Sequence, residues 1–177
     1  MTAVVSALDA HSLQGIVGLR YAPQDLVQSD LPGKEMYMIE TDPQYLADRY
    51  MAQWTVPDAA ERRAAIELLW AEDGTHILQP PAEIREIAAE LGFDHTTLEA
   101  QGHDAIELRV ARSYERFVEM KGFTFRPRAN AVRLHGVVKF GWETVSTATG
   151  DVVGGGLEIL VLDDDGRIKA DYMFPGA

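Results

Sequence analysis

The sequence predicts an α+β domain in which three main helices pack on the concave face of a curved, mostly antiparallel sheet. Three observations lead to this prediction. Helical periodicity dominates from Thr41 to Gly122, and two-residue alternation dominates after Gly122. The long apolar segment 152–162 is interrupted by Gly154-Gly155-Gly156, which predicts a bend or bulge. Helices first and strands afterwards favour α+β over parallel βαβ units. A curled sheet with helices on its concave side would form a cone with an internal pocket.

Composition limits the classes of function. The chain has 177 residues and is 46% hydrophobic, which is enough for one domain with its own core. A formal net charge of −12 disfavours binding to phosphate backbones. The absence of cysteine excludes disulfides and thiolate chemistry. We see no apolar run of membrane-spanning length and no secretory signal pattern, so we expect a cytoplasmic protein without nucleic-acid or membrane partners.

The first 35 residues differ from the rest. They contain several glycines and prolines and show no sustained period. We expect residues 1–35 to form an N-terminal extension and residues 36–177 to form the domain.

The first helix is predicted to begin at Asp42 and Pro43, which supply a polar cap and a proline at the first helical position. Leu46, Tyr50 and Trp54 recur every four residues. They therefore share one helical face.

The second helix begins at Asp58, which forms a capping-box pattern with Glu61. Its apolar stripe consists of Ile66, Leu69 and Trp70. Asp73-Gly74 is predicted to end this helix with a turn.

The middle of the chain predicts a short strand and two further helices. Residues 75–79 are extended in character and stop at Pro80-Pro81. Residues 82–91 have helical spacing and end at Gly92. A longer helix runs from Gly102 to about residue 121, with one side formed by Ile106, Val110, Ser113, Tyr114 and Phe117.

The remaining chain predicts strands. Phe123 and Phe125 alternate with polar residues, as do Val138, Phe140, Trp142 and Thr144. In the last strand the alternation of apolar side chains is predicted to follow Ile168, Ala170, Tyr172 and Phe174.

This order of elements resembles the nuclear transport factor 2-like superfamily, and within it the SnoaL-like group named for a polyketide cyclase. Five short strings carry the resemblance over roughly residues 40–175: Arg49-Tyr50, Leu69-Trp70-Ala71-Glu72-Asp73-Gly74, Gly102-His103-Asp104-Ala105, Phe140-Gly141-Trp142-Glu143 and Leu162-Asp163-Asp164-Asp165-Gly166-Arg167-Ile168. The superfamily includes ketosteroid isomerases, dehydratases, epoxide hydrolases and non-catalytic binders. The resemblance therefore implies a small hydrophobic ligand of polyketide, terpenoid or steroid type, no cofactor, and a homodimer formed through the convex sheet face.

Tyr50 and Glu158 are the first candidate catalytic pair. Ketosteroid isomerases hold an oxyanion between a tyrosine on the first helix and a carboxylic acid on the penultimate strand, and the resemblance places Tyr50 and Glu158 at these positions. A carboxyl group in an apolar pocket is driven toward its neutral form, which can donate a hydrogen bond. The alternative is that the two groups only satisfy each other as part of the core.

The general base of the isomerases has no counterpart. They carry an aspartate on the short strand after the second helix, where this sequence has Leu78 and Gln79. Neither can take up a proton at neutral pH. His76 on the same strand is the best remaining base, because histidine titrates nearest neutrality. Gln79 could orient a water or a carbonyl, or be an ordinary strand-end residue.

The candidate ligand-binding residues are mostly aromatic. They are Trp54, Trp70, Gln79, Tyr114, Phe117, Asn130, His135, Phe140, Trp142 and Tyr172. Aromatic rings at this spacing belong either to the core or to the lining of a cavity, and Asn130 suits a turn equally well. No histidine pair has metal-ligand spacing, so we expect no metal. Two functions remain open: a cofactor-independent acid–base enzyme (an isomerase, cyclase, dehydratase or epoxide hydrolase) or a non-catalytic ligand-binding or protein-interaction module of the same fold.

Overall fold

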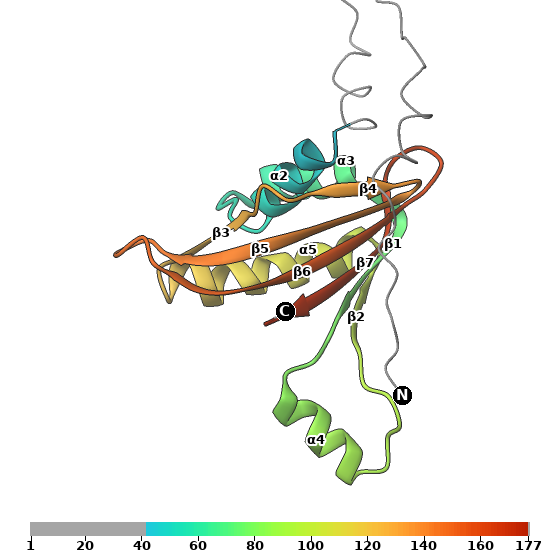
Figure 1. The fold of residues 1–177 in the computed structure, drawn as a ribbon, viewed down its shortest axis with the longest axis vertical. Helices are drawn as coiled ribbons and strands as arrows, with labels where there is room; N and C mark the ends of the chain where they lie inside the picture. Colours follow the sequence, from blue (N-terminus) through green and yellow to red (C-terminus); the bar gives the residue numbers. More distant parts are fainter. Residues whose placement is uncertain (1–41, 177) are drawn as a thin grey trace, which may run out of the picture. The chain divides into compact units, whose positions relative to one another are not determined.

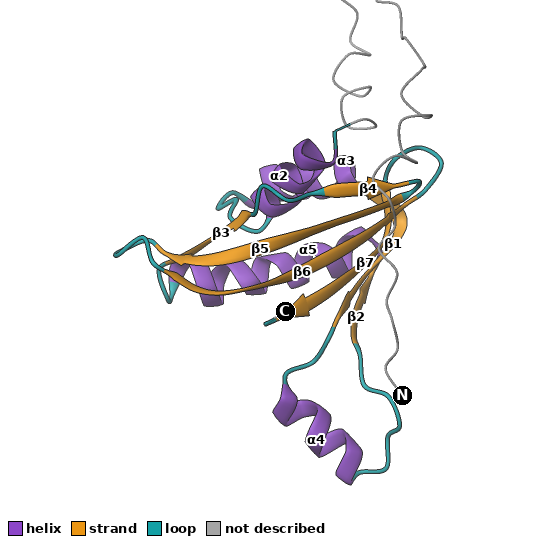
Figure 2. Ribbon diagram, viewed as in Figure 1, coloured by secondary structure: helices purple, strands orange, loops and turns teal. Residues whose placement is uncertain are grey.

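The computed structural model describes residues 42–176. The expected extension at residues 1–35, and its boundary with the domain, lie outside the described residues and stay a prediction. Within the described part, helices pack on one face of a single curved sheet, which confirms the predicted fold class (Figures 1 and 2).

The first two helices begin where the sequence predicts. In α2 (Pro43–Gln53), the Asp42 side chain accepts a 2.9 Å hydrogen bond from the Gln44 N–H. In α3 (Ala59–Leu69), the Asp58 side chain accepts a 2.9 Å hydrogen bond from the Glu61 N–H. Each cap satisfies a backbone donor that the helix itself cannot. Leu46, Tyr50 and Trp54 are buried, so the predicted core face of the first helix is confirmed.

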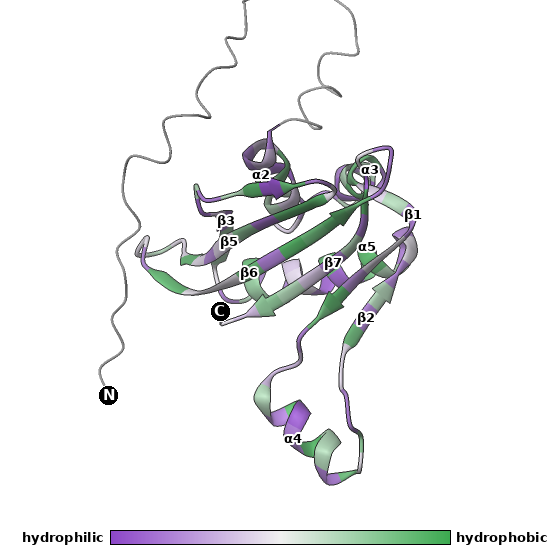
Figure 3. Cartoon of the chain, turned by 45° about the vertical axis from the view of Figure 1, so that its right-hand side comes forward, coloured by the Kyte–Doolittle hydropathy of each residue, from purple (hydrophilic) through white to green (hydrophobic). Residues whose placement is uncertain are grey.

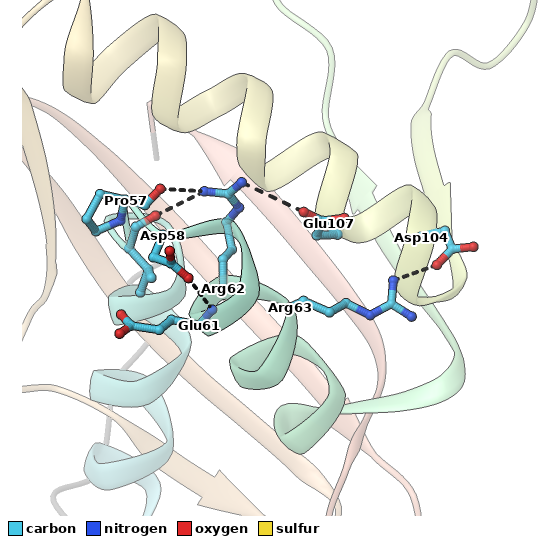
Figure 4. A network of polar contacts seen from close by, with 8 residues as sticks. Pro57, Asp58, Glu61, Arg62, Arg63, Asp104 and Glu107 are labelled. Carbon is cyan, nitrogen blue, oxygen red and sulfur yellow. Dashed lines mark hydrogen bonds and ion pairs between the residues drawn. The ribbon is translucent and has the colours of Figure 1, made fainter.

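The third large helix, α5 (Gly102–Ser113), continues as a π-helical segment, η1 (Tyr114–Glu119), and Gly122 then turns the chain with a φ of +65°. Its first half is tied to α3 by Arg62 (Figure 4). The Arg62 guanidinium donates to the Val56 carbonyl at 3.1 Å and lies 3.7 Å from Glu107 on α5. This contact holds α5 against α3, and α5 also carries Arg109, which lines the pocket described below.

The seven strands are β1 (Trp70–Leu78), β2 (Leu98–Gln101), β3 (Phe123–Pro127), β4 (Val132–Leu134), β5 (Val137–Ser146), β6 (Val152–Leu162) and β7 (Ile168–Pro175). Within the described residues they form one sheet in the order β2-β1-β7-β6-β5-β3, with β4 beside β5. β1 lies parallel to β7, and the other neighbours are antiparallel. β1, which directly follows α3, therefore lies beside β7, the last strand in the chain.

One predicted turn is wrong. Asp73-Gly74 does not end the second helix, because β1 begins at Trp70 and passes through both residues. A side chain at Gly74 would lie 2.8 Å from the Ile168 carbonyl oxygen. Glycine is therefore needed here for close approach of β1 to β7, at the point where the register between them shifts.

The helix predicted at residues 82–91 is present as α4 (Ala82–Glu90), and Gly92 follows with a φ of +86°. It connects β1 to β2 and stands clear of the sheet (Figure 3). None of its residues is buried. Within residues 42–176, no helix combines the length and apolar character needed to cross a membrane.

Candidate active site

Three ionisable side chains meet on the inner face of the sheet. His76 on β1 lies directly opposite Asp171 on β7. Asp171 in turn faces Leu160 on β6, and Glu158 lies two residues away on the same face of that strand. Diagonal neighbours of this kind are within reach of each other's side chains. His76 is 2% exposed and both carboxyl groups are 0% exposed, so the cluster is shielded from bulk solvent.

Asp171 on β7 contacts one residue on helix α2 and one on strand β1. The Tyr50 hydroxyl donates to Asp171 Oδ2 at 2.5 Å, and His76 Nδ1 lies 2.6 Å from the same oxygen. An ionised Asp171 accepts from both when His76 carries its proton on Nδ1. That tautomer leaves Nε2 as the acceptor, and Nε2 has no hydrogen-bond partner among residues 42–176. The arrangement suits a base oriented by a carboxylate.

Glu158 has a different environment. Neither of its carboxyl oxygens makes a well-formed hydrogen bond within the described residues. Burial, followed by the negative charge of Asp171, raises the pKa of Glu158 well above its usual value, while the neighbouring Trp142 indole opposes this. Burial and the two carboxyl groups likewise raise the pKa of Tyr50. Glu158 is thereby held toward the neutral acid, and Tyr50 remains a hydroxyl donor.

A glycine positions the Trp142 indole. Gly156 lies opposite Trp142 on the neighbouring strand. A side chain at Gly156 would lie 2.7 Å from the Trp142 ring and 2.6 Å from the Phe174 carbonyl oxygen. The indole can therefore lie across β6 only because Gly156 has no side chain, and this brings the indole next to Glu158.

A partly open pocket of about 410 Å³ adjoins the cluster. Met173, which lies opposite Glu158, belongs to the pocket wall, and so does Trp54, whose ring centroid is 5.5 Å from that of His76. Most of the lining is apolar: Met51, Trp54, Leu78, Pro81, Phe117, Phe123, Phe125, Trp142, Val153, Met173 and Pro175. Pockets of this size and character suit small organic molecules.

Four of the predicted ligand-binding residues, Trp54, Gln79, Phe117 and Trp142, line this pocket. The predicted catalytic residues Tyr50, His76 and Glu158 lie together, but beneath the pocket wall. Trp70 and Phe140 also lie in the core. The Trp70 indole donates to Gln53 at 3.0 Å, and Phe140 packs edge-on against Tyr50. For Trp70 and Phe140, the core interpretation applies.

Three more expected ligand contacts are absent from the pocket lining. Tyr114 follows the lining residue Ser113 by one position, which turns its side chain about 100° around the helix. Asn130 is exposed, and its side chain accepts a 2.9 Å hydrogen bond from the Gly141 N–H, which is a loop-stabilising role. His135 is exposed between β4 and β5 with a φ of +52°.

The expected position of Tyr172 is wrong, and the same irregularity explains why Asp171 was missed. Leu162 lies opposite Ile168, and Val161 lies opposite Ala170, so Lys169 is an extra residue in β7. Such a bulge reverses the alternation. Asp171 therefore points inward, and Tyr172 lies on the outer face with 40% of its surface exposed.

Arg109 on α5 is the second functional candidate that the sequence reading missed. It lines the pocket, and its guanidinium carbon lies 5.1 Å from the centre of the Trp54 ring. Burial lowers its pKa, and the nearby Tyr50, Glu158 and Asp171 oppose this shift. The sequence feature that indicates a role for Arg109 is its position three residues after Ile106, which places a charged side chain on the apolar face of its helix.

Within residues 42–176, no group of three or more histidine or acidic side chains has an arrangement that could hold a metal ion.

Comparison with known proteins supports the fold. No family model and no curated protein matches the sequence. A SnoaL-like protein from Agrobacterium tumefaciens, provisionally described as an isomerase, has a TM-score of 0.61 at 21% identity and covers 76% of this chain and 97% of its own. An NTF2-like protein of unknown function from Exiguobacterium has a TM-score of 0.51 at 20% identity and covers 73% and 97%. The chain therefore has the α+β fold shared by SnoaL-like and NTF2-like proteins.

Proposed function

We propose that the chain binds a small, mostly apolar, oxygen-bearing molecule and moves a proton on it, as an isomerase, cyclase, dehydratase or epoxide hydrolase does. The observation that carries the proposal is the buried cluster of His76, Asp171 and Glu158 beside an aromatic pocket. Unpaired polar groups in a dry core cost stability, and such clusters concentrate at functional sites.

The roles follow from the contacts. Asp171 orients His76, so that Nε2 can take a proton from the ligand while Asp171 balances the imidazolium charge. Glu158, held toward its neutral form, can donate its proton to a ligand oxygen or stabilise an oxyanion there. Tyr50 is a positioning residue in this proposal, because its hydroxyl is engaged with Asp171.

The pocket fits the proposed ligand class. Its aromatic walls suit the flat apolar body of a polyketide, terpenoid or steroid-like molecule. Its four polar lining residues, Gln79, Arg109, Ser113 and Thr144, offer contacts for oxygen atoms. We also propose a cytoplasmic homodimer that needs no cofactor and binds neither nucleic acid nor membranes. The cysteine-free composition supports the cytoplasmic location, and the acidic net charge supports the absence of nucleic-acid binding.

A second candidate function rests on one specific observation. None of Tyr50, His76, Asp171 and Glu158 belongs to the pocket lining. Catalysis would require Trp54 or Trp142 to move and expose the cluster. A non-catalytic binding module of the same fold needs no such movement.

One experiment separates the two candidates without knowledge of the reaction. Polyketides, terpenoids and steroids are screened for binding by native mass spectrometry, and each binder is incubated with the protein in D₂O. An enzyme introduces deuterium at a carbon atom or converts the ligand, and either change is visible by mass spectrometry and NMR.

The matched variants are His76→Gln and His95→Gln, because His95 is exposed in a loop. The His76 variant and Glu158→Gln should each lose about 100-fold or more of the rate, and the His95 variant should keep it. Binders that never exchange or react would support the non-catalytic module instead.

A further inference from the structure

One residue in the pocket lining carries a charge that an apolar ligand does not explain, and it is Arg109. It faces an otherwise largely apolar wall and makes no hydrogen bond or ion pair with any other described side chain. Arginines elsewhere on α5 and on the adjacent helix α3 differ. Arg112 is exposed and bonds Glu115 at 2.8 Å, and Arg62 contacts carbonyl oxygens and Glu107.

An unpaired, largely buried cation is costly. The face of Trp54 offers a cation–π contact, which compensates only part of the lost hydration. The two carboxyl groups nearby do not bond to the guanidinium. Glu158 is held toward its neutral form, and Asp171 is engaged with Tyr50 and His76. The charge of Arg109 is therefore left for a group that enters the pocket.

Ser113 adds a second donor at the same place. It lies four residues after Arg109 on α5, so the two side chains are neighbours on one helical face, and both line the pocket. The Ser113 hydroxyl makes no side-chain hydrogen bond with another described residue. A guanidinium with a hydroxyl one turn away can hold the two oxygens of a carboxylate.

We propose that the pocket selects molecules that combine an apolar, flat body with one carboxylate group, which binds Arg109 and Ser113. The apolar body then lies against Phe117, Phe125 and Trp142, which line the same pocket and whose rings pack edge-on, Phe117 on Phe125 and Phe125 on Trp142. This inference names the ligand class of the proposed function and rests on that function's pocket, but not on any turnover.

Isothermal titration with a matched pair of probes tests it. The probes are 2-naphthoate and 2-naphthamide, which have the same ring system and nearly the same shape. We expect the acid to bind the wild-type chain at least tenfold more tightly than the amide. Equal affinities, or no binding of either probe, would overturn the proposal.

Variants assign the preference to the residue. Arg109→Gln should abolish the acid preference, and Arg109→Lys should keep a reduced one. Arg112→Gln removes a charge from the same helix outside the pocket and should leave the preference unchanged. Ser113→Ala should weaken only the acid, by about threefold. An acid preference that survives in a folded Arg109→Gln variant would also contradict the proposal.

The unliganded variants provide an independent readout. Because burial works against the Arg109 charge, Arg109→Met should melt at the same temperature as the wild type or higher. A lower melting temperature would mean that the charge serves the fold and not a ligand. A negative deuterium-exchange result would remove the proposed enzyme activity and leave this binding result standing, so the two failures are distinguishable.

Discussion

The Tyr50 hydroxyl donates a 2.5 Å hydrogen bond to the Asp171 carboxylate in the buried core, although 121 positions separate the two residues in the chain. It ties α2 to β7, and the same carboxylate oxygen contacts His76 on β1. One buried oxygen thus connects a helix and two strands. Removing its charge should affect both the fold and the chemistry.

Asp171→Asn tests this connection. The amide oxygen can still accept from both Tyr50 and His76 at the Oδ2 position, but both hydrogen bonds lose the carboxylate charge, and the amide NH₂ group takes the buried Oδ1 position, which has no hydrogen-bond partner among the described residues. We expect a loss of about 2–4 kcal/mol in the free energy of unfolding, measured by chemical denaturation. Asp164→Asn, in the exposed turn before β7, should change it by less than about 0.5 kcal/mol. Equal effects of the two substitutions would show that the Tyr50–Asp171–His76 contacts contribute little.

Glu158→Gln should reveal the raised pKa as a pH-dependent stability. In the unfolded chain the glutamate releases its proton near pH ~4.3, whereas the folded protein keeps that proton to higher pH. Between the two values stability falls as pH rises, by about 1.4 kcal/mol for each unit that separates them. Glutamine does not titrate. The variant should therefore be more stable than the wild type at pH 8, with an advantage that shrinks toward pH 4.

The measurement is urea denaturation of both proteins at several pH values between 4 and 9. Glu86→Gln, an exposed substitution on α4, is the control and should show no such pH-dependent gain. A Glu158→Gln variant that is less stable at every pH would mean that the carboxylate is ionised and needed in the folded state.

Gly156→Ala should disturb the wall between the pocket and the carboxyl pair. The new methyl group would lie 2.7 Å from the Trp142 ring and 2.6 Å from a backbone oxygen, so the indole must move. We expect a loss of about 1–3 kcal/mol in stability and weaker ligand binding. Gly154→Ala lies in the same strand and the same pocket, but its methyl group would have ordinary contacts of 3.6 Å to Thr144. The Gly154 variant should be tolerated, and equal losses in both variants would refute the role given to Trp142.

Periodicity was sufficient for most of the fold, because the features that define it are local. The caps at Asp42 and Asp58 and the alternating strand β5 can be read within a few residues. The inward position of Glu158 also follows from simple alternation along β6. These features need no knowledge of the neighbouring strands.

The rest depended on how strands pair. Lys169 is an extra residue only in relation to β6, and this pairing decides that Asp171 faces the core and Tyr172 faces outward. Gly74 similarly looks like a helix end until β7 is placed beside it. Tyr50, His76 and Glu158 could therefore be read from the sequence, whereas Asp171, the carboxylate that joins His76 to Tyr50, could not.

The homodimer expected from the resemblance makes a prediction about the outer sheet face. Ile159 on β6 lies opposite both Lys139 and Tyr172, so these three side chains form one row on the face opposite the buried cluster. If two copies meet there, Tyr172→Glu would bury a charge in the interface and weaken dimerisation at least tenfold.

Light scattering after gel filtration should then give twice the chain mass of 19.6 kDa for the wild type, and 19.6 kDa for the variant at micromolar concentration. Ile87→Glu places the same charge on α4, at a side chain that is 57% exposed, and should leave the dimer intact. Dissociation of the Ile87 variant instead would move the interface to α4, because a charge there can disturb association only if that helix is covered by the second copy.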